Sequence, residues 1–390
     1  MKIKHVVLVV LGVSFLVSCS NKKQEKVIVV KNNLDTERTS ETIELSKDFL
    51  KVEDLLTIGI RDLETHSLQF TKVVYNDGYC IMDELLFQPK LAAKSEKKYS
   101  IVKITEAERP KAEAYCYSRF VPERTDDYAW ENDKVAFRTY GPIAQKMFED
   151  NIKGGTLSSG IDAWLKRVDY SIINKWYKKY TEKTGTYHED TGEGLDNFHV
   201  GKSRGVGGIA YKSDTTYYVS KNFKNWKTIT TGPIRTSFIL DYGSWDAGGK
   251  MVKESKKISL DLGNNLSKIE ISLTGIDEVS AGLTLHNKKG EVSGSNKNNW
   301  VSYWEPLDDS EIGTGIVATP DYFSSYETYD SEIKDWSNAF LNLKVKDQKV
   351  VYYAGFGWKK SKQFSSKEEW ENYLNHFSKR INNPLTVELQ

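Results

Sequence analysis

The sequence predicts an all-β protein, a large antiparallel β-sandwich with a few peripheral helices. Apolar and polar residues alternate through many short segments, as in Ile258–Leu262 and Ile269–Leu273, and a period of two places the apolar side chains of a strand on one face. Residues of turn type separate these segments, for example at 76–78 (NDG) and 263–265 (GNN). Spacing typical of βαβ units is scarce, which favours antiparallel sheets packed face to face.

Ten segments carry the strand pattern most clearly, and two carry the pattern of a helix. In Ser171–Thr184 and Ser366–Ile381 the apolar residues recur every three or four positions, which is typical of an amphipathic helix. The run SKEE at 366–369 is a capping box that opens the second helix. The expected strands are Leu68–Tyr75, Lys98–Ile104, Ala114–Val121, Lys134–Tyr140, Thr215–Val219, Ile234–Tyr242, Lys257–Leu262, Lys268–Gly275, Gly282–His286 and Lys349–Gly357.

Composition limits the classes of protein that this chain can form. It has 390 residues, of which 39% are hydrophobic and 28% are charged, with a formal net charge of +1. This balance is typical of a globular protein and gives no overall attraction for nucleic acid. Aromatic residues make up 12% of the chain, which suits both a core and the stacking of sugar rings. We expect residues 41–390 to form a single β-sandwich unit that carries the catalytic site.

The first residues have the features of a targeting segment. Lys2 and Lys4 form a basic start, and the apolar run Val6–Val17 leads to Cys19. Residues 1–18 are therefore expected to be a signal peptide of the bacterial lipoprotein type, with a lipid on Cys19 and a polar tether over 19–40. Ser20 after the Cys favours the outer membrane as the place of the anchor. The alternative is a plain secretory signal in which the Cys is incidental.

Two further thiols, Cys80 and Cys116, are isolated in the sequence. Outside the cytoplasm they can form a disulfide, but a buried free thiol at Cys116 fits the sequence equally well. Without a CxxC spacing, they do not indicate a structural zinc site. No bound metal and no cofactor is predicted.

The most unusual stretch runs from Gly185 and reads GTYHEDTGEGLDNFHVGKSRGVGG, with seven Gly among 24 residues. Long loops inside compact domains are more often functional than idle. His188 and His199 can transfer protons near neutral pH, and Asp196 and Arg204 add charges beside them. The alternatives are a surface loop with solvated charges, or a metal ion held by the acidic and His side chains. No recognised ligand spacing supports the metal.

A second candidate segment is the strand that ends near Tyr140. Alternation places Lys134, Arg138 and Tyr140 on one face of this strand. A fixed guanidinium beside a phenol suits the binding of a carboxylate with proton transfer next to it. Arg124 and Trp130 lie just upstream, and an indole ring can stack on a sugar face. The alternative is an exposed sheet face with an Arg–Asp pair and a buried Trp.

Several runs of this chain together resemble one bacterial protein family. They are DYAWENDKVAFRTYGP, WLKRVDYSIINKWY, YHEDTGEGLDNFHVGKSRGVGG, YYVSKNF, GPIRTSF and DELLFQ, and they are spread over nearly the whole chain after the targeting segment. The family is catalogued as a domain of unknown function, is common in lipoproteins of polysaccharide-utilising bacteria, and includes dehydratases of ulvan breakdown. The resemblance implies elimination of water across C4 and C5 of a glucuronate or iduronate at the non-reducing end. The implied partner is a uronate-containing, sulfated oligosaccharide, and the product is a 4,5-unsaturated uronate.

The types of residue in the two candidate segments also suit this reaction independently of the resemblance. The C5 hydrogen of a uronate is very weakly acidic, so its carboxylate must be neutralised first, and Arg138 or Arg204 is expected to do so. His188 and Tyr140 are the expected proton-transfer pair, with the roles of base and acid left open. We expect these four residues to be catalytic and to converge on one cleft.

A second set of residues is expected to bind the substrate without taking part in proton transfer. It consists of Arg124, Trp130, Lys134, His199 and Asp196. Two other classes of function compete with the dehydratase. One is a glycan-binding lipoprotein without catalysis, and the other is a glycoside hydrolase with a carboxylate pair such as Glu193 and Asp196.

Overall fold

The β-rich fold expected from the sequence is confirmed by a computed structural model, which describes residues 26–75, 82–112 and 116–390. Its sheets are antiparallel, with helices at the periphery. The expected signal peptide, Cys19 and Cys80 lie outside the described residues, while Cys116 is a buried free thiol. No helix within the described ranges combines the length and the apolar character needed to cross a membrane.

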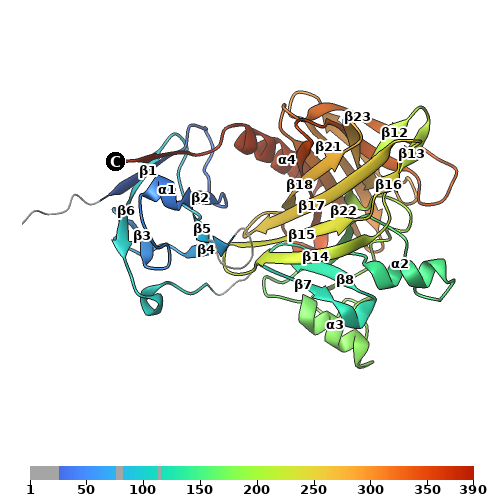
Figure 1. Ribbon diagram of the computed structural model, residues 1–390, viewed down its shortest axis with the longest axis horizontal. Helices are drawn as coiled ribbons and strands as arrows, with labels where there is room; N and C mark the ends of the chain where they lie inside the picture. Colours follow the sequence, from blue (N-terminus) through green and yellow to red (C-terminus); the bar gives the residue numbers. More distant parts are fainter. Residues whose placement is uncertain (1–25, 76–81, 113–115) are drawn as a thin grey trace, which may run out of the picture.

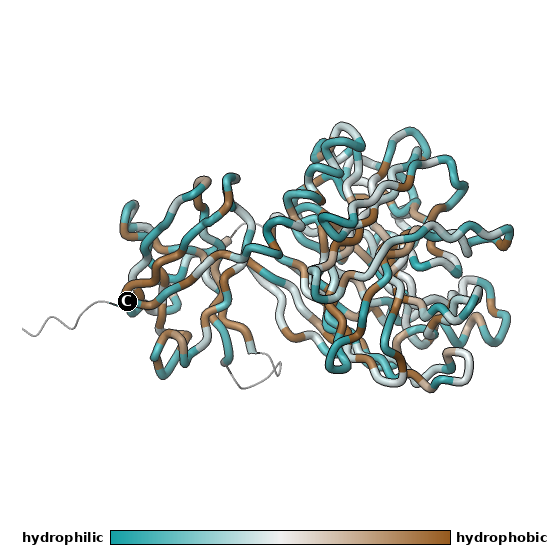
Figure 2. The backbone as a smooth tube through the Cα atoms, turned by 90° about the horizontal axis from the view of Figure 1, so that it is seen from above, coloured by the Kyte–Doolittle hydropathy of each residue, from teal (hydrophilic) through white to brown (hydrophobic). Residues whose placement is uncertain are grey.

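The described chain forms a small lobe and a large lobe, which a narrow waist joins (Figures 1 and 2). The small lobe contains a four-stranded sheet in the order β26-β1-β6-β3 and a three-stranded sheet in the order β2-β5-β4. Ile28, Leu45, Ile60 and Leu85 are among the buried residues between the two sheets, so this lobe has a core of its own. Its elements are β1 (Val27–Lys31), β2 (Ile43–Ser46), α1 (Lys47–Leu50), β3 (Ile58–Asp62), β4 (Thr71–Tyr75), β5 (Met82–Phe87), β6 (Glu96–Lys103) and β26 (Thr386–Leu389).

The expectation of a polar tether over residues 19–40 is wrong for its second half. Residues 27–31 form β1, which pairs with β6 on one side and with β26 on the other. Ile28 and Val30 are fully buried. The short apolar run VIVV inside a polar segment was the signal for a central strand, because a strand paired on both sides and buried needs no long alternating pattern.

The large lobe is built from three sheets. A nine-stranded sheet follows the order β14-β15-β17-β18-β25-β22-β21-β20, with β16 paired to β17 off this path, and its inner face carries a five-stranded sheet in the order β13-β12-β19-β24-β23. The third sheet has the order β11-β10-β9-β8-β7. The strands are β7 (Tyr117–Val121), β8 (Asp127–Glu131), β9 (Ala136–Thr139), β10 (Asp162–Lys166), β11 (Gly194–Leu195), β12 (Val206–Ser213), β13 (Thr216–Tyr218), β14 (Phe223–Thr230), β15 (Arg235–Tyr242), β16 (Trp245–Asp246), β17 (Met251–Asp261), β18 (Leu266–Thr274), β19 (Glu278–Thr284), β20 (Glu291–Ser295), β21 (Trp300–Leu307), β22 (Ser310–Ala318), β23 (Phe323–Tyr329), β24 (Asn338–Lys344) and β25 (Lys349–Trp358).

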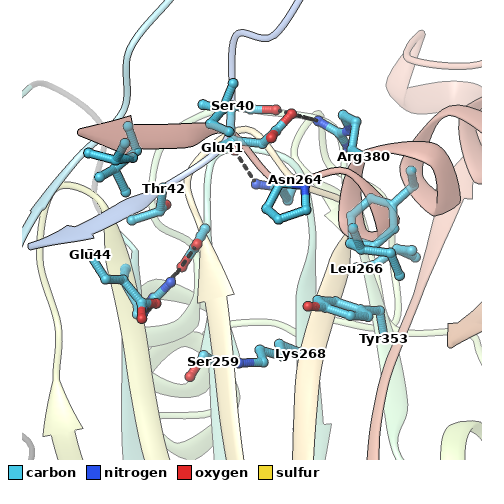
Figure 3. Close-up of a pocket in the computed structure, with 18 residues that line it drawn as sticks. Ser40, Glu41, Thr42, Glu44, Ser259, Asn264, Leu266, Lys268, Tyr353 and Arg380 are labelled. Carbon is cyan, nitrogen blue, oxygen red and sulfur yellow. Dashed lines mark hydrogen bonds and ion pairs between the residues drawn. The ribbon is translucent and has the colours of Figure 1, made fainter. Parts of the chain in front are cut away.

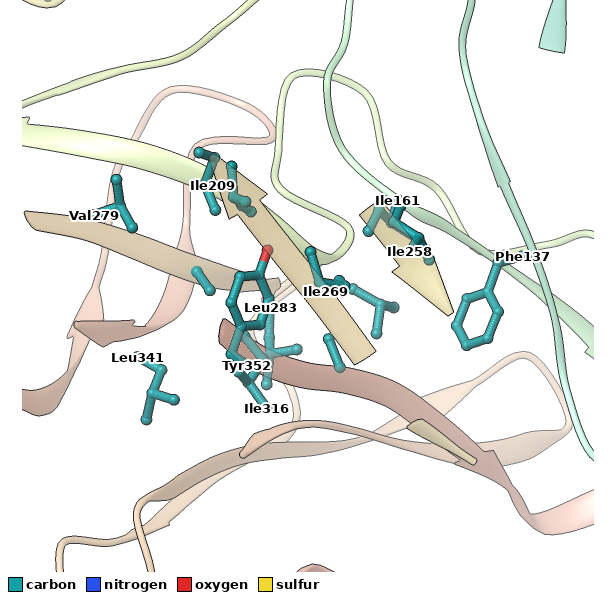
Figure 4. Packing of buried hydrophobic residues seen from close by; sticks show 14 of the residues in the cluster. Phe137, Ile161, Ile209, Ile258, Ile269, Val279, Leu283, Ile316, Leu341 and Tyr352 are labelled. Atoms are coloured by element: carbon teal, nitrogen blue, oxygen red, sulfur yellow. The ribbon is translucent and has the colours of Figure 1, made fainter. Parts of the chain in front are cut away.

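The core of the large lobe lies between the nine-stranded sheet and the two smaller ones. Ile258 and Ile269 from the large sheet face Leu283 and Leu341 of the five-stranded sheet across this core (Figure 4). Phe137 brings β9 into the same core, since its ring lies 5.3 Å from that of Phe356. One face of the third sheet therefore packs against the large sheet, and its other face is available to pack against another element.

Helices of two to four turns cover the large lobe. Helix α3 (Ile173–Thr181) packs on the free face of the third sheet, where Trp164 and Tyr177 belong to a separate buried cluster. Helix α4 (Lys367–Asn382) packs on β21 and β22, and the hydroxyl of Ser366 accepts a hydrogen bond from the Glu369 amide, as the capping pattern predicts. Helix α2 (Pro142–Glu149) follows β9 directly and forms one wall of the cavity described next.

Candidate functional site

A cavity of about 690 Å³ opens at the end of β9. Four segments form its walls: the end of β9, helix α2 with the residues after it, the glycine-rich loop, and the loop that precedes β24. Its lining residues are Arg138, Tyr140, Phe148, Gly155, Thr156, Leu157, His188, Asp196, Asn197, Phe198, His199, Val200, Gly201, Lys202, Ile333, Lys334 and Asp335. The structure thus brings together two segments that the sequence singled out separately.

Arg138 lies at the back of this cavity and is held by carboxylates of the protein itself. It stands directly opposite Asp162 in the β9–β10 ladder, and its Nε and Nη2 donate to the Asp162 carboxylate at 3.0 and 2.5 Å. Nη2 also donates to Asp196 at 2.9 Å, and Nη1 lies 3.8 Å from Asp127. Nη1 further donates to the Tyr187 hydroxyl at 3.4 Å. The guanidinium fork is therefore occupied, so Arg138 is unsuited to clamp a substrate carboxylate, contrary to expectation.

Two of the carboxylates around Arg138 have raised pKa values. Burial raises the pKa of Asp127 to about 6, although Arg138 and Arg124 lower it. Burial, followed by the nearby Asp196 carboxylate, raises the pKa of Asp162 well above its usual range. One oxygen of Asp127 and one of Asp162 accept no hydrogen bond within the described residues. This cluster therefore binds protons more readily than exposed carboxylates do.

His188 is held in one tautomer by the backbone. Its Nδ1 lies 2.7 Å from the carbonyl oxygen of Asp196, and a carbonyl oxygen only accepts hydrogen bonds, so Nδ1 carries the proton. Its Nε2 makes no hydrogen bond to any described residue, and the side chain is 53% exposed. In the neutral imidazole, Nε2 is therefore the nitrogen with the lone pair, and it is open to whatever enters the cavity.

Tyr140 also lies on the cavity wall. Burial, followed by the Asp162 carboxylate, raises the pKa of Tyr140 well above its usual range, even though the Arg138 guanidinium lies 5.4 Å from the ring centre. The phenol therefore keeps its proton at physiological pH. One cavity thus holds both the phenol of Tyr140 and the imidazole of His188.

The outer wall of the cavity joins two loops. His199 Nε2 donates to Asp335 Oδ2 at 3.0 Å and so links the glycine-rich loop to the loop before β24. Lys202 and Lys334 are exposed and line the same wall. Position 201, between His199 and Lys202 in the sequence, requires a glycine, because φ is 52° there and a Cβ would lie 2.2 Å from the Asp335 carboxylate.

Two of the expected site residues are buried elsewhere, so their assignment to the cleft is wrong. Arg204 is 2% exposed and donates to Ser159 Oγ and to the Ile209 carbonyl, because the chain turns inward there to begin β12. Burial lowers the pKa of Arg204 to about 10. Trp130 is fully buried, stacks on Phe137 at 5.3 Å and donates its indole N–H to Ser267.

The remaining expected binding residues divide between the cavity and its surroundings. His199 and Asp196 line the cavity. Arg124 lies behind it and donates to the hydroxyl of Tyr187 at 3.3 Å. Lys134 does not belong to the site, since it stands in the β8–β9 turn at the opposite end of β9 and pairs with its neighbour Asp133 at 3.5 Å.

The alternatives built on acidic residues lack the required geometry. Glu193 does not line the cavity, since its carboxylate binds Tyr170, Lys175 and Trp176 on the outside of the loop. It therefore cannot form a catalytic pair with Asp196. Within the described ranges, no group of three or more His, Cys, Asp or Glu side chains is arranged to hold a metal ion.

Sequence reasoning missed four charged residues of the site. Asp127 and Asp162 meet Arg138 only through the pairing of β8, β9 and β10, which the sequence does not reveal. Lys334 and Asp335 come from a loop more than a hundred positions beyond the glycine-rich loop. The only local signal was the position of Asp162 on a short apolar segment, where an acidic side chain needs a buried partner.

A second cavity, of about 400 Å³, lies between the two lobes. Arg235 of β15 forms its floor with Asp261, at 2.5 and 2.9 Å, and reaches Glu44 of the small lobe at 2.6 Å. Figure 3 shows Tyr353 and Leu266 on the side of helix α4, with Glu44 and Ser259 opposite. The described residues that line this cleft include no His, and Arg235 is closed by acidic partners, so the cleft is less suited to proton transfer than the first cavity.

Comparison with known proteins gives one family and two similar proteins. The model of the family described as "Domain of unknown function (DUF4861)" matches residues 30–387. Over 394 residues the chain is 52% identical to the uncharacterized protein P7 of Formosa agariphila, covering 99% of this chain and 100% of that protein. A solved protein in the glycosyl hydrolase family 38 from Enterococcus faecalis is similar with a TM-score of 0.51 and 10% identity, over 94% of this chain. This chain spans about half, 48%, of that protein's length, and at such identity the likeness concerns the fold alone.

Proposed function

This chain belongs to the DUF4861 family, and we propose that it is a carbohydrate dehydratase, a carbon–oxygen lyase. In this proposal it eliminates water from a glucuronate or iduronate at the non-reducing end of ulvan-type oligosaccharides and leaves a 4,5-unsaturated uronate. The observation that carries the proposal is one cavity with a tautomer-fixed His188 and a protonated Tyr140 on its wall. A site that only binds glycans needs neither group in these states.

His188 is the base in this scheme. Its Nε2 takes the proton from C5 of the uronate, while Nδ1–H keeps its hydrogen bond to the Asp196 carbonyl. The pair of electrons from the C5–H bond forms the C4=C5 double bond, and the C4–O4 bond breaks. Positioned proton transfer of this kind contributes about 10²–10⁴-fold to the rate.

Tyr140 is the acid. Its phenol donates a proton to O4 as the C4–O4 bond breaks, so that the leaving group departs as water. The phenolate formed at that moment lies beside the Arg138 guanidinium, which stabilises it. Proton exchange with solvent then restores both residues, and no other reactant is consumed.

The substrate carboxylate needs a cation other than Arg138 or Arg204. Arg138 is closed by Asp162 and Asp196, and Arg204 is buried away from the cavity. Lys202 and Lys334 are the other cationic side chains of the cavity wall, and both are exposed. We therefore assign the neutralisation of the uronate carboxylate to Lys202 and Lys334, with His199 and Asp196 as further binding residues.

The location of the enzyme is part of the same proposal. A lipid on Cys19 would hold the protein at the outer membrane, where it meets oligosaccharides released outside the cytoplasm. In Cys19→Ala we expect unprocessed precursor in cell fractions. A variant that is cleaved and partitions into membranes like the wild type would contradict the anchor.

The test of the function is a direct assay of the product. Purified protein is incubated with uronate-ended oligosaccharides, and the ultraviolet absorbance of the conjugated uronate is followed. His188→Ala and Tyr140→Phe should lose about 10²–10⁴-fold in initial rate. Their thermal melts should change little, because the His188 side chain is 53% exposed and Tyr140→Phe keeps the ring that packs against the core. Tyr353→Phe in the inter-lobe cleft is the matched control and should retain the full rate. If the wild type binds the oligosaccharide without forming unsaturated product, the glycan-binding alternative replaces the dehydratase.

A further inference from the structure

A chain of four polar residues runs behind the outer wall of the cavity. Glu305 of β21 contacts Nδ1 of His286, and Nε2 of His286 lies 2.9 Å from the backbone carbonyl oxygen of His199. The His199 ring in turn holds Asp335 at 3.0 Å. His286 does not line the cavity itself, but it contacts the segment from which His199 and Lys202 reach the wall.

The hydrogen bonds of His286 require an extra proton. Nε2 faces a carbonyl oxygen, which can only accept, so Nε2 must carry a hydrogen. Nδ1 faces a carboxylate oxygen, and a neutral imidazole with its proton on Nε2 would place two lone pairs against each other there. The contact is favourable only if a proton lies between Nδ1 and Glu305, whichever of the two groups carries it.

The surroundings keep this pair apart from solvent. The His286 side chain is 13% exposed and that of Glu305 only 1%. Phe198 packs edge-on against the imidazole, with ring centres 4.6 Å apart. The second Glu305 oxygen accepts no hydrogen bond from the described residues. The phenol of Tyr303 packs against Glu305 and donates to the Leu285 carbonyl oxygen.

Other charged groups near His286 are already paired. Lys288 forms an ion pair with Asp330 and donates to the Ser331 carbonyl oxygen. Asp335 is engaged by His199. The contact between His286 and Glu305 is therefore attractive when a proton lies between the two groups and repulsive when it does not.

We infer that His286 is a positioning residue for the cavity, and that one proton shared with Glu305 holds the His199 segment in place. Its meaning for the reaction rests on the proposed function, whereas the shared proton itself does not. When that proton is lost at alkaline pH, Nδ1 and the carboxylate repel each other, and the ring can no longer keep both contacts. The wall then loosens, and substrate binding weakens before the chemical step is affected.

The substitution Glu305→Gln should keep both hydrogen bonds of His286 while removing the need for the shared proton. The side-chain amide that this substitution introduces can donate to an unprotonated Nδ1, while Nε2–H still donates to the His199 carbonyl, so both contacts survive without the extra proton. In the wild type, we expect the dissociation constant for a uronate-ended oligosaccharide to rise about tenfold between about pH 6 and about pH 9, because a charge-assisted contact is lost. In Glu305→Gln this rise should be absent, and in His286→Ala binding should be weak at every pH. The contact between His199 and Asp335 is the same in the wild type and in Glu305→Gln, so the difference between the two proteins isolates the pair.

A measurement that needs no substrate keeps this inference apart from the proposed function. Nitrogen NMR of the His286 ring should show a proton on Nε2 and a shared proton at Nδ1 at about pH 7. The amide protection factors of residues 197–202, which compare each exchange rate with the intrinsic rate of an unstructured amide at the same pH, should fall as that proton is lost. In Glu305→Gln, Nδ1 should be unprotonated and these protection factors should be independent of pH. An unprotonated Nδ1 in the wild type at about pH 7, or a Glu305→Gln variant whose protection factors fall at alkaline pH as in the wild type, would overturn the inference even if the oligosaccharide proves not to bind.

Discussion

The cavity at the end of β9 and the cleft between the lobes contain the same kind of ion pair and put it to different use. In each, an arginine grips the aspartate of a neighbouring strand with two nitrogens: Arg138 with Asp162, and Arg235 with Asp261. In the cleft, Glu44 from the other lobe completes the cluster. In the cavity, further carboxylates surround the arginine, and a histidine and a phenol stay open to a ligand. An arginine in a cavity is thus no sign of ligand binding until its own partners have been identified.

Removal of the arginine should show the difference most strongly. Arg138→Met leaves Asp162 and Asp196 buried without their cation, which should lower the free energy of unfolding by about 3–5 kcal/mol. Arg235→Met breaks the equivalent pair, but Glu44 is 42% exposed and is solvated on its own. Asp261 is 19% exposed and loses its cation, so the cleft variant should lose about 1–3 kcal/mol in denaturant unfolding, less than Arg138→Met. Equal losses would mean that the two pairs do not differ in burial energy as described.

The lysines of the two cavities should separate binding from structure. Lys202→Ala with Lys334→Ala should raise KM about 10- to 100-fold and leave kcat nearly unchanged, since two charge-assisted contacts to the substrate carboxylate are lost. The matched control is Lys268→Ala in the inter-lobe cleft, where the ammonium pairs with Glu270. Initial rates over a range of oligosaccharide concentrations give KM and kcat for each variant. A double variant with wild-type KM would show that a group other than these two lysines binds the substrate carboxylate.

The acidic cluster around Arg138 predicts a pH dependence of stability. Because the pKa of Asp127 is raised to about 6 by burial, the folded state binds this proton more tightly than the unfolded chain does. Its contribution to stability is therefore largest at low pH and falls as pH rises through the folded pKa. Asp127→Asn should gain about 1–2 kcal/mol on the wild type between about pH 4 and about pH 7. Urea unfolding of both proteins at the two pH values measures this, and a constant difference would contradict the shift.

The smallest effect is expected where the lobes meet. Glu44→Gln removes one half-exposed charge from Arg235 while Asp261 remains in place. Such pairs contribute about 0–1 kcal/mol, so the thermal melt should shift little and turnover should be unchanged. A large loss of turnover in Glu44→Gln would show that lobe contacts control the distant cavity.

The sequence predicted those parts of the fold in which one strand face differs from the other. β17 and β18 were expected because their apolar residues alternate. β21 and β22 were not, because they are buried on both faces and lack the period of two. A separate core for the small lobe was also not foreseen, since β26 reaches it from the far end of the chain.

The site shows the same division between local and distant information. Arg138 and Tyr140 follow from the faces of one strand, and His188 from an unusual loop. The position of Arg204 could not be derived, because the left-handed backbone at Gly205 turns the chain into β12 and takes the preceding side chain inward. Likewise, only the strand pairing shows that Arg138 already has its anionic partners.

The pairing of β1 with β26 has a consequence for the order in which the protein can mature. Ile28 lies opposite Leu389 and Val30 opposite Val387, so the small lobe needs both its earliest and its latest strands. During synthesis the segments of this lobe emerge from the ribosome first, whereas β26 follows all strands of the large lobe. The lobe that is made first is completed last, because one side of β1 has no partner strand until β26 has been synthesised after α4.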